Sequence, residues 1–273
     1  MPNTAVNKYD AAIAEESIFR KIGTAFKVYD AAHHILAKDY DDLAQFVPEG
    51  GNIPIFEGIN DFTPYSIESH KLAAFVKMNT DFVHDATFDI EDHLVKRFAK
   101  NFANAEDKAF INGTGEQMPT GILDATKGAV VGKTTDSITY DDIINLYFSL
   151  RPEYRKNAVW LMNDETALEL RSLKDSAGNY LWRDSDDTIL SKKVVITEFM
   201  PNAESDNKPI AFGDFSYYWI IGRRPVSVKT LIEKFALLDQ IGYLAFEFID
   251  GKLIRRDAVK VIQMNTISLS NKG

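Results

Sequence analysis

One glycine- and lysine-rich stretch has a composition that could bind phosphate. Residues 127–134 have the sequence KGAVVGKT. A phosphate-binding loop needs four residues between its first glycine and its Gly-Lys-Ser/Thr triplet, because the loop amides must surround the phosphate before a helix begins. Here Gly128 and Gly132 enclose only three residues, and Lys127 occupies the position where the first glycine is needed. The spacing therefore argues against nucleotide binding and indicates a connector.

Histidines and acidic clusters are the other residues that could hold a metal ion. None of the five histidines belongs to an HExxH motif and no two lie four positions apart, so the sequence encodes no local zinc site. The acidic clusters at 39–42 and 184–187 lack the glycine and the final glutamate of a calcium loop. We expect no bound metal and interpret both clusters as solvated loops.

Nucleophilic and redox chemistry also lack a motif. The chain has no cysteine and no GxSxG sequence, which excludes a thiolate and a nucleophile elbow. Gly113-Thr114-Gly115 is not followed by the third glycine of a dinucleotide fingerprint. We therefore expect no catalytic residue, no cofactor and no enzymatic activity. The alternative is an α/β enzyme whose site is assembled from residues far apart in the sequence.

Charge and hydropathy argue against a nucleic-acid-binding protein, a membrane-spanning protein and a secreted protein. The formal net charge is −9, and the lysines and arginines form no basic stripe of the kind that nucleic-acid binders display. No apolar run approaches the length of about 18 residues that spans a membrane. The N-terminus lacks the basic and apolar regions of a secretory signal. We expect a globular protein with neither a membrane segment nor sequence-specific DNA binding.

The strongest structural signal is one long helix. Between Asp89 and Ile111, apolar residues recur three or four positions apart. Thr87 or Asp89 can cap the start, and the sequence NGTG at 112–115 ends the helix. At 1.5 Å per residue the helix is about 35 Å long, so we expect it to cross the whole subunit. Its apolar positions are Ile90, Leu94, Phe98, Phe102, Ala105, Ala109 and Phe110.

A proline- and glycine-rich segment precedes this helix. Residues 44–64 contain three prolines and three glycines between two strand-like segments, Ala31–Lys38 and Tyr65–Lys77. Such a hairpin is not stable alone and must lie on a partner surface. The alternative is an irregular surface loop, although loops of this length are uncommon in compact domains. The residues expected to contact another subunit are Phe46, Val47, Pro48, Glu49, Ile53, Ile55, Phe56 and Phe62.

The segments before the hairpin and after the long helix give weaker signals. Residues 1–30 are weakly amphipathic and are predicted to be an arm that packs on another molecule, or else a frayed terminus. Beyond the long helix, alternating helices and strands predict a compact α/β domain. Three later strands predict an antiparallel set with a turn at Asp250-Gly251. The predicted elements are a helix at Tyr140–Leu150 capped by Thr139, a helix at Asp164–Leu173, and strands at Asn157–Met162, Val194–Thr197, Pro209–Gly213, Val226–Leu231, Tyr243–Ile249 and Leu253–Met264.

The order of these features resembles the major capsid proteins of tailed phages, the Hong Kong 97-type family, whose fold encapsulins share. Each motif is weak alone, but their order covers nearly the whole chain. The matching stretches are Phe46–Gly50 with Pro54, Phe75–Lys77, Asp85–Asp89, the helix end at Asn112–Gly115, Pro119–Leu123, Asn157–Asn163, Leu173–Leu181, Ile210–Phe215 and Ile254–Ala258.

The resemblance implies an α+β fold with named parts. Residues 1–30 would be the N-terminal arm and 31–76 an extended hairpin, the E-loop, that lies across a neighbouring subunit. Residues 77–123 would be a peripheral domain built on the long spine helix. Residues 124–224 would be the axial domain, and 225–273 the return strands of the peripheral domain.

The resemblance also implies a function. The chain would be a structural shell subunit of a tailed phage or prophage that assembles with itself into pentamers, hexamers and an icosahedral head enclosing DNA. It would be located in the virion after assembly in the bacterial host cytoplasm, with a portal, a maturation protease and a separate scaffold protein as further partners. The alternative within the same fold is an encapsulin-like nanocompartment shell.

Two departures from the family pattern carry expectations. Many members begin with a coiled-coil scaffolding segment that this sequence lacks, which implies a processed or shortened form or a separate scaffold. Some members cross-link their subunits with a glutamate as base. The stretch 236–243 offers only Asp239 and Gln240, so we expect no covalent cross-linking.

Overall fold

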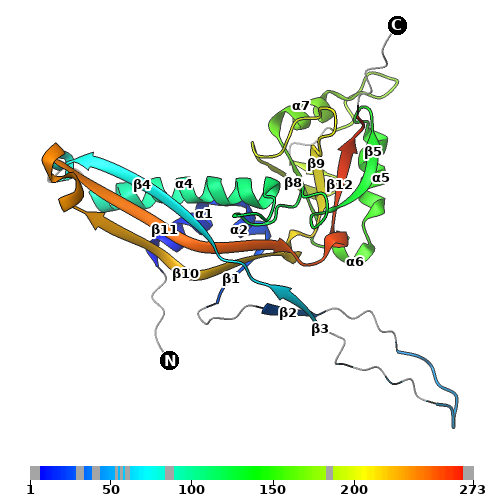
Figure 1. The fold of residues 1–273 in the computed structure, drawn as a ribbon. Coiled ribbons are helices and arrows are strands. Elements are labelled where there is room, and N and C mark those ends of the chain that lie inside the picture. The colour runs from blue at the N-terminus through cyan, green and yellow to red at the C-terminus, as the bar shows by residue number, and fades with distance from the viewer. Residues whose placement is uncertain are drawn as a thin grey trace, which may run out of the picture.

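The computed structural model describes residues 7–28, 34–38, 44–52, 55, 58, 62–83, 89–182 and 187–266. The molecule has an elongated part, a compact part at one end of it, and a hairpin that projects away from their junction (Figure 1). Helices and sheets occur in both main parts, which confirms the α+β class.

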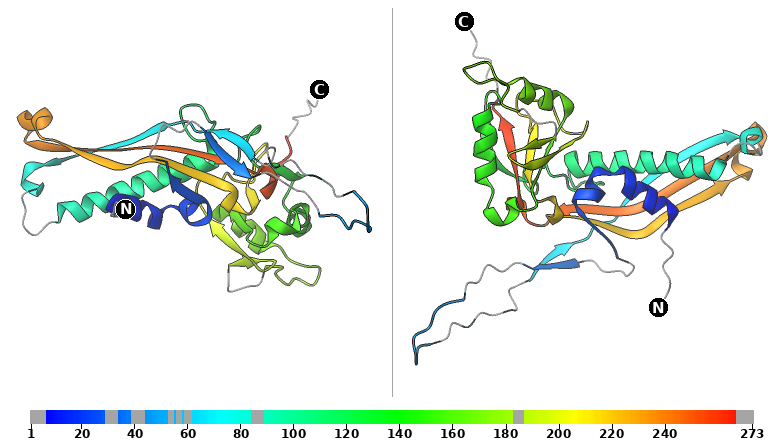
Figure 2. Two further views of the ribbon diagram at one scale, coloured as in Figure 1. Left: turned by 90° about the horizontal axis from the view of Figure 1, so that it is seen from below. Right: turned by 180° about the vertical axis from the view of Figure 1, so that it is seen from behind.

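The elongated part is a four-stranded sheet in the order β1-β10-β11-β4. Strands β10 and β11 are long and antiparallel, and β1 pairs with β10 in parallel. Helix α4 runs along one face of this sheet with α1 and α2 beside it (Figure 2). The elements of this part are α1 (Lys8–Glu16), α2 (Ile18–Ile22), β1 (Thr24–Lys27), β4 (His70–Asn79), α3 (Thr80–Val83), α4 (Ile90–Asn112), β10 (Tyr218–Leu231), η2 (Glu233–Leu238) and β11 (Gln240–Leu253).

Helix α4 is the predicted spine helix. It begins where the Asp89 carboxylate accepts the Asp92 backbone N–H at 3.0 Å, and it ends at Gly113, whose N–H donates to Ala109 O at 2.8 Å. Phe98 and Phe102 are fully buried and pack toward β4, β10 and β11. The predicted helix, its cap and its buried face are confirmed.

The compact part is a six-stranded sheet in the order β5-β12-β9-β6-β8-β7. Trp160 stacks on Phe212 with ring centroids 4.0 Å apart in its core. Thr139 and Asp142 form a capping box at the start of α5, as the sequence predicts for Thr139. Its elements are β5 (Val130–Thr135), α5 (Tyr140–Ser149), α6 (Pro152–Arg155), β6 (Val159–Met162), α7 (Asp164–Ser172), β7 (Thr188–Ile189), β8 (Lys192–Ile196), β9 (Ile210–Gly213), η1 (Phe215–Tyr217), η3 (Arg256–Ala258) and β12 (Val259–Met264).

The C-terminal strands differ from the prediction. The predicted turn at Asp250-Gly251 is wrong, because β11 runs unbroken from Gln240 to Leu253. A Cβ on Gly251 would lie 2.5 Å from the Tyr218 hydroxyl and 2.8 Å from the Phe110 ring, so the glycine permits close packing rather than a turn. Strand β12 then joins the six-stranded sheet instead of the antiparallel set. The predicted boundary at 224/225 falls inside β10.

The N-terminal segment also differs from the prediction. Residues 7–27 are not frayed, because α1 and α2 dock on α4 of the same chain. Ile13 and Phe19 are completely buried, and Asp107 of α4 accepts hydrogen bonds from the Ser17 hydroxyl and the Phe19 N–H. The sequence signal was weak because two short helices with few apolar residues are stabilised by contacts far along the chain.

The projecting hairpin is formed by β2 (His34–Lys38) and β3 (Phe62–Ser66), which pair antiparallel from His34↔Ser66 to Lys38↔Phe62. The predicted second strand, Tyr65–Lys77, is in fact two strands, because the chain leaves β3 at Ser66 and enters the large sheet as β4 at His70. The buried side chain of Ile67 marks this change of sheet.

Candidate functional site

The residues predicted to contact another subunit lie on the projecting hairpin. Phe46 and Ile55 are 107% and 90% exposed, and Phe62 and Val47 are also exposed. Pro48 and Glu49 lie between them and are exposed too, whereas Ile53 and Phe56 are outside the described residues. Burying such apolar surface gains about 25 cal/mol per Å². Each described residue that the sequence predicts to contact another subunit is therefore exposed in the single subunit.

A tight turn presents this surface. The Gly51 N–H donates to Pro48 O at 2.8 Å, and Gly50 has a φ of +79°, a conformation that glycine adopts readily. Glu49 therefore lies at the corner of the turn. Figure 1 shows residues 44–52 at the far end of the hairpin from the body of the molecule.

The root of the hairpin is fixed to the body. The Tyr65 hydroxyl donates to Ile254 O at 2.8 Å, and the Glu68 N–H donates to the buried Asp250 carboxylate at 2.8 Å. Lys252 Nζ donates to Ser66 O at 2.7 Å. These contacts join residues that are about 180 positions apart, so the hairpin leaves the body in a defined direction.

A second exposed apolar surface, not predicted from the sequence, lies at the tip of the elongated part (Figure 1). Leu237 is fully exposed, and Ile232 and Leu238 are 60% and 63% exposed. Phe235 of η2 packs against Phe75 of β4 with ring centroids 5.5 Å apart. An apolar stretch between two strands was the available signal, because a connection of this kind is normally polar.

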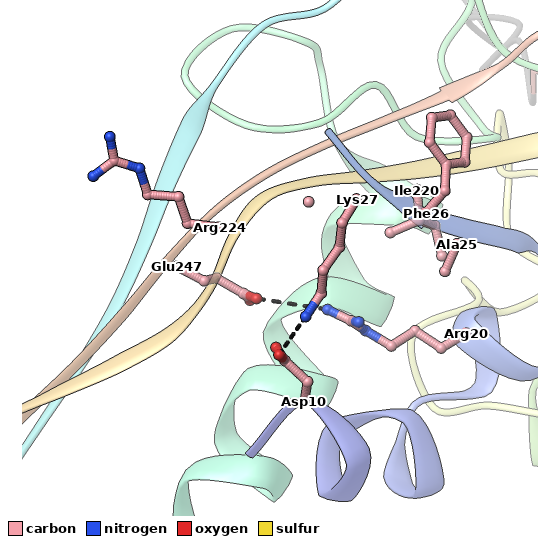
Figure 3. Close-up of a pocket in the computed structure, with 9 residues that line it drawn as sticks. Asp10, Arg20, Ala25, Phe26, Lys27, Ile220, Arg224 and Glu247 are labelled. Carbon is pink, nitrogen blue, oxygen red and sulfur yellow. Dashed lines mark hydrogen bonds and ion pairs between the residues drawn. The ribbon is translucent and has the colours of Figure 1, made fainter. Parts of the chain in front are cut away.

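A charge cluster holds the N-terminal segment on α4, and Figure 3 shows its members Asp10, Arg20, Lys27 and Glu247. Arg20 of α2 donates to both carboxylate oxygens of Glu106, at 2.7 and 2.6 Å, and lies 3.5 Å from Glu247 of β11. Lys27 of β1 pairs with Asp10 of α1 beside them. Glu106 and Glu247 are only 1% and 4% exposed. Two helices, α2 and α4, and one strand, β11, therefore meet at a single guanidinium group.

Burial shapes the protonation of this cluster. Burial raises the pKa of Glu247 well above its usual range, and the Glu106 charge raises it further. Although burial opposes it, the pairing with Glu106 raises the pKa of Arg20, so the guanidinium stays charged. One oxygen of Glu247 has no hydrogen-bond partner among the described residues. The raised pKa favours the neutral, protonated form of Glu247 in this buried cluster.

The sequence segments examined for chemistry have other roles. Residues 130–135 of the glycine- and lysine-rich stretch form β5 rather than the helix entry of a phosphate loop. Within the described residues no three His, Asp or Glu side chains gather as metal ligands. No helix of the described part is both long and apolar enough to cross a membrane.

Comparison with known proteins agrees with this geometry. Residues 1–264 match the model of the phage capsid family. The chain is 30% identical over 147 residues to the "Probable major capsid protein gp17" of Mycobacterium phage D29, a match covering 53% of this chain and 46% of the relative. The match to the protein of the same name in Mycobacterium phage L5 is 28% identical over 152 residues. The chain thus spans about half the length of these curated relatives.

Solved structures show the same fold. The capsid chain of a native GTA particle has a TM-score of 0.73 at 28% identity, with 91% of this chain and 90% of that chain covered. A chain of Microbacterium phage Oxtober96 has a TM-score of 0.64 at 16% identity, with 92% and 91% covered. The expected Hong Kong 97-type fold is confirmed, and neither the enzyme nor the encapsulin alternative is favoured.

Proposed function

The chain belongs to the phage capsid family, and we propose that it is the major structural subunit of an icosahedral phage or prophage head. It assembles with itself into pentamers and hexamers. The observation that carries this proposal is the projecting hairpin, whose apolar residues Phe46, Ile55 and Phe62 are exposed although its root is firmly fixed. A hairpin of this kind is stable only when another surface covers it.

The E-loop, residues 31–76, supplies the contact. Its apolar residues, together with Pro48 and Glu49, lie across a neighbouring subunit of the same ring. Binding costs consume much of the hydrophobic gain, so each contact is weak and reversible, as the assembly of a closed shell requires. Repetition around the ring makes the sum of the contacts strong.

The remaining partners follow from the shell role. A chain with a net charge of −9 encloses DNA without binding a particular sequence. We assign the protein to the virion, after assembly in the host cytoplasm with a portal, a maturation protease and a scaffold protein. The peripheral domain contains α4 and the four-stranded sheet, and the axial domain contains the six-stranded sheet.

Replacing residues 40–64 by a short Gly/Ser linker tests the proposal. We expect a folded, soluble subunit that forms no shells, because none of the described residues of this segment belongs to the cores of the two main parts. Circular dichroism measures folding, and negative-stain microscopy with sedimentation measures assembly.

A matched pair of variants sharpens the test. Phe46→Ser combined with Ile55→Ser should abolish assembly, whereas Gln45→Ser combined with Asn52→Ser, on the same loop, should leave it intact. Shells that still assemble without residues 40–64 would reject the proposal, and so would a linker variant that is unfolded.

A further inference from the structure

The root of the hairpin borders a basic pocket. The pocket has a volume of about 220 Å³ and lies between β3, the loop after α4 and the end of β11. Lys127, Lys252 and Arg256 line it together with the hydroxyl-bearing Tyr65, Thr120 and Thr126. None of the described residues that line it is acidic. The pocket is therefore positively charged although the net charge of the chain is −9.

The cations of this pocket are not equally neutralised. Lys252 Nζ lies 3.4 Å from the Asp250 carboxylate and 3.7 Å from Glu68, so its charge is largely balanced within the subunit. Arg256 Nε donates to a backbone carbonyl, Gly128 O, at 2.8 Å, which satisfies a hydrogen bond without removing charge. Lys127 has an exposed side chain.

One carboxylate lies near Lys127 but is already engaged. Asp124 accepts the backbone N–H groups of Thr126 and Lys127 at 2.9 and 2.7 Å, and these bonds lower its pKa although burial opposes them. Asp124 therefore offsets part of the positive charge and does not line the pocket. The pocket keeps an excess of donors and positive charge, and the complementary group is an anion.

We infer that this pocket receives Glu49 of a neighbouring copy of the chain, as the acceptor for its E-loop. This rests on the proposed shell function. Glu49 stands at the corner of an exposed turn and is the one charged side chain in the described stretch 44–52. Tyr65 of β3 lines the pocket at the root of the hairpin. Residues 44–52, which include Glu49, lie at the far end of the hairpin (Figure 1), so a Glu49 that fills the pocket comes from another copy.

A carboxylate suits the pocket better than a nucleic-acid phosphate. DNA contacts usually form a basic stripe that follows the phosphate backbone, whereas this site is a single concave pocket in an acidic chain. A hairpin that docks into the next subunit makes a head-to-tail contact, and contacts of this type close into rings.

Cross-linking gives the direct test. Assembled wild-type shells built from mixed labelled and unlabelled subunits are treated with a carbodiimide, which joins a carboxylate to an adjacent lysine amine. We expect Glu49 to be joined to Lys127 or Lys252 of a different copy, as identified by mass spectrometry. Links from Glu49 only to lysines elsewhere would overturn the inference.

Matched variants give the energetic test. Glu49→Gln removes a negative charge and Gln45→Lys adds a positive one, so both change the net charge of the loop equally. Only Glu49→Gln should raise the protein concentration needed for assembly, by about tenfold or more. Lys127→Gln should act likewise, and Lys193→Gln, an exposed lysine on β8, should not. The double exchange Glu49→Lys with Lys127→Glu should restore assembly above either single exchange.

The outcomes separate this inference from the proposed function. If the wild type forms shells and the Glu49→Gln and Lys127→Gln variants assemble equally well, the inference is overturned and the shell function stands. Loss of binding to a DNA fragment in Lys127→Gln, with assembly unchanged, would reassign the pocket to phosphate and overturn it as well. A wild-type chain that forms no shells at any salt concentration would overturn both.

Discussion

Glu247 links the stability of the subunit to pH. Burial, followed by the charge of Glu106, raises its pKa well above the ordinary value of 4.5. A group whose pKa is higher in the folded chain binds its proton more tightly there. Protonation of Glu247 therefore stabilises the fold. This stabilisation is complete below the pKa of the group in the unfolded chain and is lost as the pH rises through its pKa in the folded chain.

We expect Glu247→Gln to weaken this pH dependence. Denaturant unfolding between about pH 5 and about pH 9 should show the wild-type free energy of unfolding falling with pH more steeply than that of the variant. Asp107, whose pKa burial also raises, acts in the same direction and remains in both proteins. The exposed Glu233→Gln serves as control. Parallel curves for wild type and Glu247→Gln would contradict the assignment.

Gly251 gives a second prediction at the level of one residue. A methyl group there would meet the Tyr218 hydroxyl and the Phe110 ring, so Gly251→Ala should destabilise by about 1–3 kcal/mol. A Cβ on Gly222, in β10 of the same sheet, meets only the Lys27 side chain at 3.7 Å, and Gly222→Ala should be nearly neutral. Thermal melts measure both, and equal effects would argue against the packing role of Gly251.

The spine helix carries the prediction at the level of elements. Phe102 of α4 is buried against the sheet, so Phe102→Ala should cost about 3–5 kcal/mol through lost burial and a cavity. Asn101 faces solvent on the same turn, and Asn101→Ala should change stability by less than about 0.5 kcal/mol. Chemical denaturation compares the two variants, and a reversed ranking would place the wrong face of α4 toward the sheet.

Elements with local signals could be predicted from the sequence. Asp89 and Thr139 start α4 and α5 as predicted, because a cap depends only on the next few residues. The face that a short helix buries is harder to predict, because few apolar positions define it: in α5 Phe148 is 65% exposed, whereas Leu146 is buried. Tyr147 stacks on Phe212 of β9, and Phe148, the next position round the helix, faces outward.

Contacts between distant residues could not be predicted. Nothing local distinguishes β12 from β11, yet the two strands belong to different sheets. Glu106, Asp107 and Glu247 have the composition of exposed residues, and they are buried only because Arg20 and Ser17 supply their partners. The exposed hairpin surface was predictable because it needs no partner within the subunit.

At the scale of the whole molecule, net charge should control assembly. Each copy carries −9, so a shell of many copies accumulates repulsion that salt screens over roughly 8–10 Å. Light scattering at constant protein concentration should show more and larger particles as ionic strength rises from low values. Size distributions that stay identical across the series would argue against this prediction.

The docking of the N-terminal segment sets an order of events during synthesis. The Asn7 side chain donates to the backbone oxygen of Val226, 219 positions later, and β1 pairs with β10 in the same region. A ribosome that adds about 5–20 residues per second needs roughly 10–40 s to make that partner. Helices α1 and α2 are therefore made well before the part of their binding surface that lies on β10, and their docking is completed only after β10 is synthesised.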